Sequence, residues 1–311
     1  MPSETGRTNP KWSWDTALCG VVPPMISPLN ETGESDGDAL KTLVGHILNG
    51  GCSGLFVLGG CGEGAWLTSA QRASMGRGQP CAGPGRRHAA GDRARDGCGA
   101  AGGRRERRRP RGGLAYYLGV DAATQQRHVE AILGAVSLPL LLYNIPQATH
   151  NPLAPATALR LAQNSRILGI KDSAGDFEAF QGFLAIKKQR AAFRVLQGNE
   201  YFASSSLLLG GDGLVPGMAN FAPDLFVELR RAVARGDAAA CAKLQEQITD
   251  LCTLHTHGHW LPALKAACAI LGLGNGVPSP PLLSATDEQR RAIEAILARH
   301  GFPRPPSSRH P

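Results

Sequence analysis

The 311 residues are 42% hydrophobic and 19% charged, which supplies a large core and excludes a globally disordered chain. No apolar run is long enough for a transmembrane helix, and the N-terminus lacks the apolar stretch of a secretory signal. The formal net charge of +8 suggests an anionic partner such as nucleic acid, whereas eight scattered cysteines without a CxxC pair indicate a reduced, cytoplasmic protein.

The positive charge lies in one segment, residues 76–113, because the rest of the chain has equal numbers of basic and acidic side chains. This segment contains 11 Arg, 11 Gly and 6 Ala but no Val, Ile, Leu, Met, Phe, Tyr, Trp or Lys, so it cannot supply a barrel strand or an amphipathic helix. Three interpretations stay open: an Arg/Gly arm that binds nucleic acid, a solvated loop, or out-of-frame translation of a GC-rich coding region. Residues whose codons can begin with two G or C bases fill 31 of the 38 positions, which favours the third and argues against a nucleic-acid partner.

Outside that segment, short apolar runs alternate with stretches that have apolar residues at helical spacing. Strands are predicted over 19–25, 52–58, 138–143, 167–171, 193–196 and 213–215. Helices are predicted over 36–48, from 67 onward with Thr68 as N-cap, and over 121–136, 155–163, 176–188, 201–209 and 223–235.

Strands that alternate with helices are typical of βα units around a parallel sheet. Six units are visible, and the interval between residues 58 and 121 is long enough for two more. We therefore predict an α/β fold, a (β/α)8 TIM barrel over 17–235, in which residues 76–113 stand where strands 3 and 4 should be.

The chain continues with three predicted helices, over 238–254, 261–271 and 287–299. They predict a C-terminal helical subdomain at residues 236–300. Residues 1–16 are expected to be an N-terminal extension, and the Pro-rich residues 301–311 a disordered tail.

Catalytic side chains of such barrels stand at the C-terminal ends of the strands. Lys171 closes an apolar strand, where desolvation would free its amine to attack a carbonyl, although a lysine that reaches out to solvent would look the same. Tyr143, one strand away, is a candidate proton shuttle or simply a core tyrosine. The loop at 59–64 has four glycines in six residues, which suits either carboxylate or phosphate binding by backbone N–H groups or a plain tight turn.

Three motifs carry a family resemblance: GGCGE at 59–63, YNIP at 143–146 and GIKDSAG at 169–175. In order and spacing they resemble the signatures of the dihydrodipicolinate synthase / N-acetylneuraminate lyase superfamily. GGDG at 210–213 resembles the strand-8 motif of that family, and Tyr116-Tyr117 resembles its strand-4 tyrosine pair. The similarity covers about 17–74 and 115–300 and is absent from 76–113.

The resemblance implies a class I, Schiff-base-forming lyase or aldolase that acts on a pyruvate-like 2-oxo acid. It implies Lys171 as the Schiff-base residue, Tyr143 as the proton relay, and Gly60 and Cys61 as the residues that hold the substrate carboxylate. Val215 on strand 8 is a further candidate substrate-binding residue.

The resemblance also implies a homotetramer, a dimer of dimers in which Tyr117 reaches the neighbouring site, with no metal and no organic cofactor. The histidines of HTHGH, at 255, 257 and 259, do not share one helix face, so we expect no metal site there.

Two departures from the family pattern narrow the expected reaction. Gly60 and Cys61 stand where Ser or Thr is usual, so the relay hydroxyl is missing and a weakly donating thiol replaces the second one. The stretch 147–150 lacks the arginine of true dihydrodipicolinate synthases. The first departure means that carboxylate binding would depend on backbone N–H groups, and the second favours a lyase, aldolase or dehydratase of a 2-keto-3-deoxy sugar acid or another 2-oxo acid. The alternatives are a 4-hydroxy-tetrahydrodipicolinate synthase of lysine biosynthesis, an inactive frame-damaged member, and a nucleic-acid binder.

Overall fold

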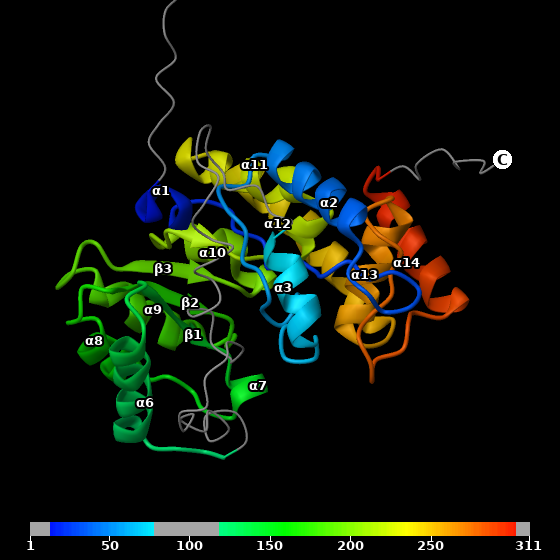
Figure 1. Cartoon of the computed structure of the whole chain (residues 1–311). Coiled ribbons are helices and arrows are strands. Elements are labelled where there is room, and N and C mark those ends of the chain that lie inside the picture. Colours follow the sequence, from blue (N-terminus) through cyan, green and yellow to red (C-terminus); the bar gives the residue numbers. More distant parts are fainter. Residues whose placement is uncertain (1–12, 78–117, 303–311) are drawn as a thin grey trace, which may run out of the picture.

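The computed structural model describes residues 13–77 and 118–302 and contains a parallel β-sheet (Figure 1). Its strands are β1 (Leu140–Asn144), β2 (Ile167–Asp172), β3 (Arg194–Gln197) and β4 (Gly213–Leu214), in the order β1-β2-β3-β4. All three pairings are parallel, as the alternation of strands and helices predicted.

The first two predicted strands continue this sheet only as isolated parallel bridges. Val21 pairs with Leu214, and Pro24 pairs with Phe56. Pro23 and Pro24 have no N–H to donate, which limits a regular ladder there. The predicted strand over 52–58 is therefore shorter than expected, and most of it is half-buried rather than buried.

The helices follow the predicted order, and aspartate side chains cap several of them. Aspartates 36, 121 and 176 accept N–H groups at the starts of α2 (Gly37–Asn49), α6 (Ala122–Ala135) and α9 (Phe177–Ile186), because a short side-chain oxygen satisfies donors that the first turn leaves free. Thr68 caps α3 as predicted. The short helices α1 and α7 were not predicted. The helices are α1 (Trp14–Leu18), α2 (Gly37–Asn49), α3 (Ser69–Arg77), α6 (Ala122–Ala135), α7 (Pro146–Thr149), α8 (Pro155–Leu161), α9 (Phe177–Ile186), α10 (Ala203–Leu208), α11 (Pro223–Ala234), α12 (Ala238–Cys252), α13 (Trp260–Ile270) and α14 (Asp287–Arg299), with 3-10 turns η1 (Glu200–Phe202), η2 (Gly217–Asn220) and η3 (Thr253–Thr256).

Three hydrophobic clusters hold these elements together. The first joins α2 and α11 to the C-terminal helices α12, α13 and α14. The second packs α6, α8 and α9 against β1, β2 and β3. The third is the small sheet interior, formed by Leu18, Leu196 and Val215 with Phe56, Leu141 and Leu168 against them. As a result, α6 and α8 lie at one end of the molecule and α13 and α14 at the other (Figure 1).

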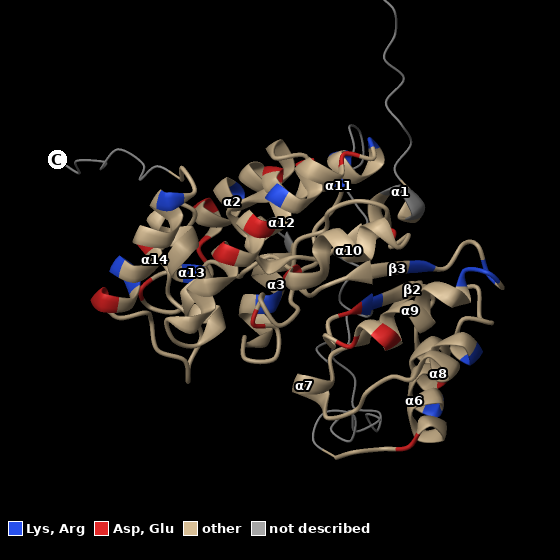
Figure 2. Ribbon diagram, turned by 180° about the vertical axis from the view of Figure 1, so that it is seen from behind, with Lys and Arg blue, Asp and Glu red and all other residues tan. Residues whose placement is uncertain are grey.

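Charge is evenly distributed over the described residues. Figure 2 shows basic and acidic side chains interspersed along the helices, in agreement with the neutral balance outside 76–113. Within the described ranges, no helix has the length and apolar character that crossing a bilayer requires. Most of the 76–113 segment, the tail from 303 and the extension up to residue 12 lie outside the described residues.

Gly45 gives a test of the helical packing. It lies inside α2, and a Cβ added there would have no atom within 4 Å. We expect Gly45→Ala to raise the free energy of unfolding by about 0.5–1 kcal/mol, because alanine loses less backbone entropy on folding into a helix. Urea denaturation checks this result. Gly51→Ala is the control and should destabilise, since Gly51 has φ +88°.

Candidate active site

Lys171 lies near the C-terminal end of β2 with its side chain turned among aromatic rings. The residue is 4% exposed and is paired in register with Tyr143 of β1. Its Nζ lies 4.3 Å from the centre of the Tyr143 ring and 4.9 Å from that of Phe56. Both distances are within the range of a cation–π contact. The amine is therefore shielded from bulk water, as expected for a nucleophilic lysine, rather than extended into solvent.

Phe56 is a part of this site that sequence reasoning missed. Its ring meets the Tyr143 ring edge-on, with the two centres 6.3 Å apart. Tyr143 itself is 38% exposed, so it lies at the rim of the site and not in the core. The sequence did not mark Phe56 as a site residue, because a phenylalanine in an apolar run indicates only a strand.

Gly198 makes room for the lysine. A Cβ at Gly198 would lie 2.8 Å from Lys171 Cε and 2.1 Å from Ser173 Oγ, closer than real side chains approach. The backbone N–H of Gly198 donates to the carbonyl of Asp172 over 2.7 Å, which holds the loop after β3 against the end of β2. The absence of a side chain at this position lets the Lys171 stem lie flat against the backbone.

Asn144 and Asp172 lock the ends of β1 and β2 together, one residue beyond Tyr143 and Lys171. They are opposite each other in register, and Asn144 Nδ2 donates to Asp172 Oδ1 over 2.7 Å. Asn144 Oδ1 also accepts the N–H of Leu153. Both side chains are buried, and burial raises the pKa of the Asp172 carboxyl. This hydrogen bond holds the ends of β1 and β2 in register next to Tyr143 and Lys171.

The glycine-rich loop (residues 59–64) follows the strand position of Phe56. Gly60 is exposed, with open space where a side chain would be. The neighbouring Cys61 is half-buried, and burial raises the pKa of its thiol to about 12, although the Lys171 charge opposes this effect. The thiol therefore stays uncharged at neutral pH and is a weak donor.

The loop after β4 meets the glycine-rich loop from the other side. A Cβ on Gly217 would lie 3.7 Å from Cys61 Sγ and 3.4 Å from Glu200 Oε1. Glu200 accepts the N–H of Gly217 over 2.6 Å, a role that the sequence did not reveal. The structure therefore brings Lys171, Tyr143 and Cys61 to one end of the sheet.

Val215, another sequence-predicted residue, lies next to this group in the third hydrophobic cluster, against which Phe56 packs. The Val215 side chain is buried in the sheet interior against Leu18 and Leu196. Tyr117 lies outside the described residues.

Comparison with known proteins identifies the fold family. The model of the Dihydrodipicolinate synthetase family matches residues 17–78 and 114–300. The chain belongs to this family. The predicted (β/α)8 barrel class is thereby confirmed, although the described residues show six of the eight strand positions.

Relatives of this Dihydrodipicolinate synthetase family chain include both aldolases and synthases. The probable 2-dehydro-3-deoxy-D-pentonate aldolase YjhH of Escherichia coli K12 is 30% identical, over 91% of this chain and 97% of the relative. The dihydrodipicolinate synthase structure of Bacteroides thetaiotaomicron matches with TM-score 0.74 and 26% identity, over 91% and 98% of the two chains. The structure of YagE from E. coli K12, solved in complex with pyruvate, matches with TM-score 0.74 and 22% identity, over 91% and 99%.

Of the histidines at 255, 257 and 259, the last is exposed and the other two are half-buried. His259 caps α13 by accepting the N–H of Leu261. His255 is half-buried, and burial lowers its pKa. Among residues 13–77 and 118–302, no group of three or more His, Cys, Asp or Glu side chains is arranged to hold a metal ion.

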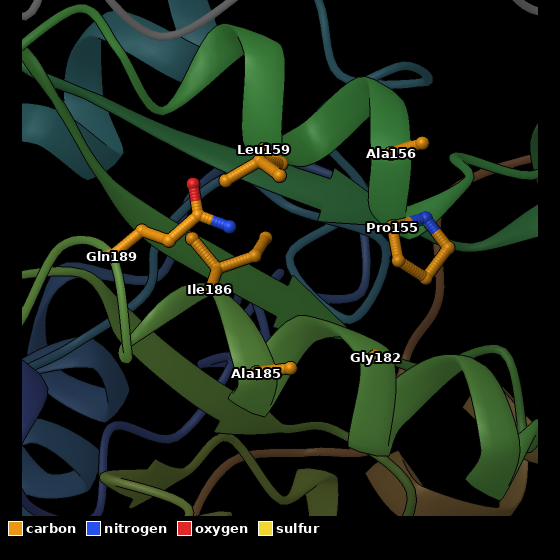
Figure 3. A pocket seen from close by; sticks show the side chains of 7 residues that line it. All are labelled: Pro155, Ala156, Leu159, Gly182, Ala185, Ile186 and Gln189. Atoms are coloured by element: carbon orange, nitrogen blue, oxygen red, sulfur yellow. The ribbon is translucent and has the colours of Figure 1, made fainter.

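An open pocket between α8 and α9 is separate from this site (Figure 3). Its lining is apolar or small except for one glutamine and has no titratable group: Pro155, Ala156, Leu159, Gly182, Ala185, Ile186 and Gln189. It therefore offers no acid, base or nucleophile for the reaction of this family member.

Proposed function

We propose that the protein is a Schiff-base-forming lyase of the aldolase type that acts on a pyruvate-like 2-oxo acid. The observation that carries the proposal is the amine of Lys171, buried at a strand end and in register with Tyr143. The family match and the aldolase relatives support the same reaction class.

In the proposed reaction, the neutral Lys171 amine attacks the ketone carbon of the substrate, and the carbinolamine loses water to give an imine. The imine at C2 accepts the electron pair that the C3–C4 bond leaves on C3 when it breaks. In the cleavage direction, the C4 hydroxyl gives up its proton, the C3–C4 bond breaks, and an aldehyde leaves. The enamine that remains takes a proton at C3, and hydrolysis of the imine then releases pyruvate and restores the lysine.

Tyr143 is the proposed proton carrier for these steps. Its ring lies against Lys171 Nζ, and the residue is 38% exposed, so a substrate bound to Lys171 could reach it. A tyrosine there can deliver a proton to the departing hydroxide and later take one from the C4 hydroxyl. The backbone N–H groups of Gly60 and Cys61 are the proposed partners of the substrate carboxylate.

The residues after β1 favour a sugar-acid-like substrate over the dipicolinate pathway. Positions 147–150 contain no arginine, and Gln147 uses its amide to hold the loop after β2, donating to Ala174 O over 2.6 Å. No arginine therefore stands at 147–150 to bind a second carboxylate. The synthase of lysine biosynthesis remains the competing assignment, because such enzymes are also among the relatives.

We also propose a cytoplasmic homotetramer. The cysteines that the structure describes have free thiols, which suits a reducing compartment. Size-exclusion chromatography with light scattering measures the assembly.

Borohydride trapping tests the proposed function. The protein is incubated with pyruvate, reduced, and read by intact mass and peptide mapping. We expect one reduced adduct on the peptide that contains Lys171. Absence of any adduct on soluble protein with the mass of this sequence would contradict the proposal and favour an inactive family member. The same peptide map shows whether the protein contains residues 76–113 as given in this sequence.

Cys61→Ser tests the proposed carboxylate site. A serine hydroxyl is a stronger donor than a thiol, and a hydrogen bond contributes about 0.5–1.5 kcal/mol, so we expect the KM for the 2-keto-3-deoxy sugar acid to fall by about two- to tenfold. Steady-state kinetics measure this change. Cys241→Ser, at a buried cysteine on α12, is the control and should leave the KM unchanged. An unchanged or higher KM in Cys61→Ser would remove this side chain from the substrate site.

A further inference from the structure

A buried ion pair joins the glycine-rich loop to the C-terminal helices. Lys265 of α13 donates from Nζ to Glu63 Oε1, and the two residues are separated by 202 positions in the sequence. Lys265 is 2% exposed and Glu63 is 1% exposed. Both charges have left water, which is costly unless each is fully paired.

The remaining polar atoms of this pair are satisfied from the same subdomain. Lys265 Nζ also donates to the carbonyl of Val277 over 2.7 Å. The backbone N–H of Ser279 donates to Glu63 Oε2. Burial lowers the pKa of Lys265, and the Glu63 carboxylate opposes that effect. The Glu63 carboxylate is therefore clamped between a helix and the segment that follows it.

The Glu63 backbone connects this ion pair to the proposed carboxylate site, because it forms the turn after Gly60 and Cys61. Glu63 adopts φ +55°, a conformation that is uncommon for a residue with a side chain. Its N–H donates to the carbonyl of Gly60 over 3.1 Å, and its own carbonyl accepts the N–H groups of Trp66 and Leu67. The position of the Glu63 side chain thus sets the turn that orients Gly60 and Cys61.

Two other contacts brace the loop from the barrel side. Ser27 Oγ donates to Gly62 O over 2.7 Å, and Arg72 donates to Gly64 O over 2.9 Å. These contacts hold the flanks of the loop, whereas Glu63 holds the turn itself from the C-terminal subdomain.

We propose that Glu63 and Lys265 are positioning residues, which fix the backbone N–H groups of Gly60 and Cys61 for the carboxylate of the 2-oxo acid. The C-terminal helices then form part of the substrate site by holding its anion-binding loop. This inference rests on the proposed function, because it needs a substrate carboxylate bound next to Lys171.

The experiment compares two ketones that differ in the carboxylate. Imine formation is trapped with borohydride at subsaturating pyruvate and at subsaturating acetone, and the ratio of the two rate constants is measured. Glu63→Gln keeps the side-chain volume but replaces one accepting oxygen with an N–H₂ group. That group faces another donor, either Ser279 N–H or Lys265 Nζ, so one hydrogen bond is lost. We expect the pyruvate-to-acetone ratio to fall by about tenfold or more, the effect of losing a hydrogen bond to a charged group. Lys265→Met should lower the ratio in the same direction.

Lys187→Met is the matched control. Lys187 forms an ion pair with Asp212 over 3.0 Å, at the N-terminal end of β3 and away from Lys171. The Lys187→Met variant should be less stable than the wild-type protein, but its pyruvate-to-acetone ratio of rate constants should stay within about twofold of the wild-type ratio. A ratio in folded Glu63→Gln that matches the wild-type ratio would overturn the positioning role. A purely structural role would lower both rate constants together. If the wild-type protein forms no adduct with either ketone, the proposed function itself fails, which is a different result.

Discussion

Replacement of Lys171 with arginine is expected to lower kcat/KM by about 10⁴-fold or more, within the range that removal of a catalytic nucleophile produces. A guanidinium stays protonated and cannot attack a ketone, although it keeps the positive charge between the Phe56 and Tyr143 rings. Cleavage of a 2-keto-3-deoxy sugar acid, followed through the pyruvate released, measures the loss. Borohydride with pyruvate should leave Lys171→Arg without an adduct.

Lys243→Met is the control for Lys171→Arg. Lys243 is exposed on α12 and contacts nothing at the site, so its loss should leave kcat/KM and the trapped adduct unchanged. If Lys171→Arg still gives a reduced adduct, the Schiff base forms on another lysine and the proposed mechanism is wrong. Circular dichroism of both variants separates chemistry from misfolding.

The part of the site that could be predicted is the part that strand geometry dictates. Lys171 and Tyr143 each end an apolar run, and parallel strands end at one edge of a sheet, so their proximity follows from the pattern. The register pairing of these two residues bears out this reasoning. The helix starts at Asp121 and Asp176 could also be predicted from the sequence, because a capping side chain binds N–H groups of the helix that directly follows it.

The pairing of Glu63 with Lys265 could not be predicted in the same way. Contacts between segments 202 residues apart depend on packing, which no local pattern encodes. A weak signal existed: Lys265 is the one lysine within the apolar helix Trp260–Ile270, and a buried charge needs a partner. The sequence offered many acids as partners, and only the fold selects Glu63.

The first strands were overestimated for a related reason. An apolar run such as 52–58 predicts a buried strand, but regular pairing also needs a neighbour with free N–H groups. Pro23 and Pro24 remove these donors, so the partner of Phe56 forms a single bridge. The pairing of residues 52–58 therefore depends on the prolines of the neighbouring segment and not only on the apolar run itself.

Gly198→Ala is expected to lower kcat by about 10²-fold, the effect of a displacement of roughly 1 Å at a reacting group. The added methyl would stand 2.8 Å from Lys171 Cε and 2.1 Å from Ser173 Oγ. The Ser173 hydroxyl can rotate away, whereas Lys171 is held by the Phe56 and Tyr143 rings. The amine must therefore shift along its strand end, away from the ketone that it attacks.

Gly134→Ala is the matched control, because it adds the same methyl to an exposed position of α6 with no atom within 4 Å. It should keep wild-type kcat. The decisive measurement is single-turnover trapping with pyruvate, which reports imine formation apart from later steps. Gly198→Ala should form the imine slowly yet bind pyruvate with little change in affinity, since the glycine-rich loop is untouched. A wild-type trapping rate would mean that Lys171 can reach its ketone from a second position, and that the close approach at Gly198 serves packing alone.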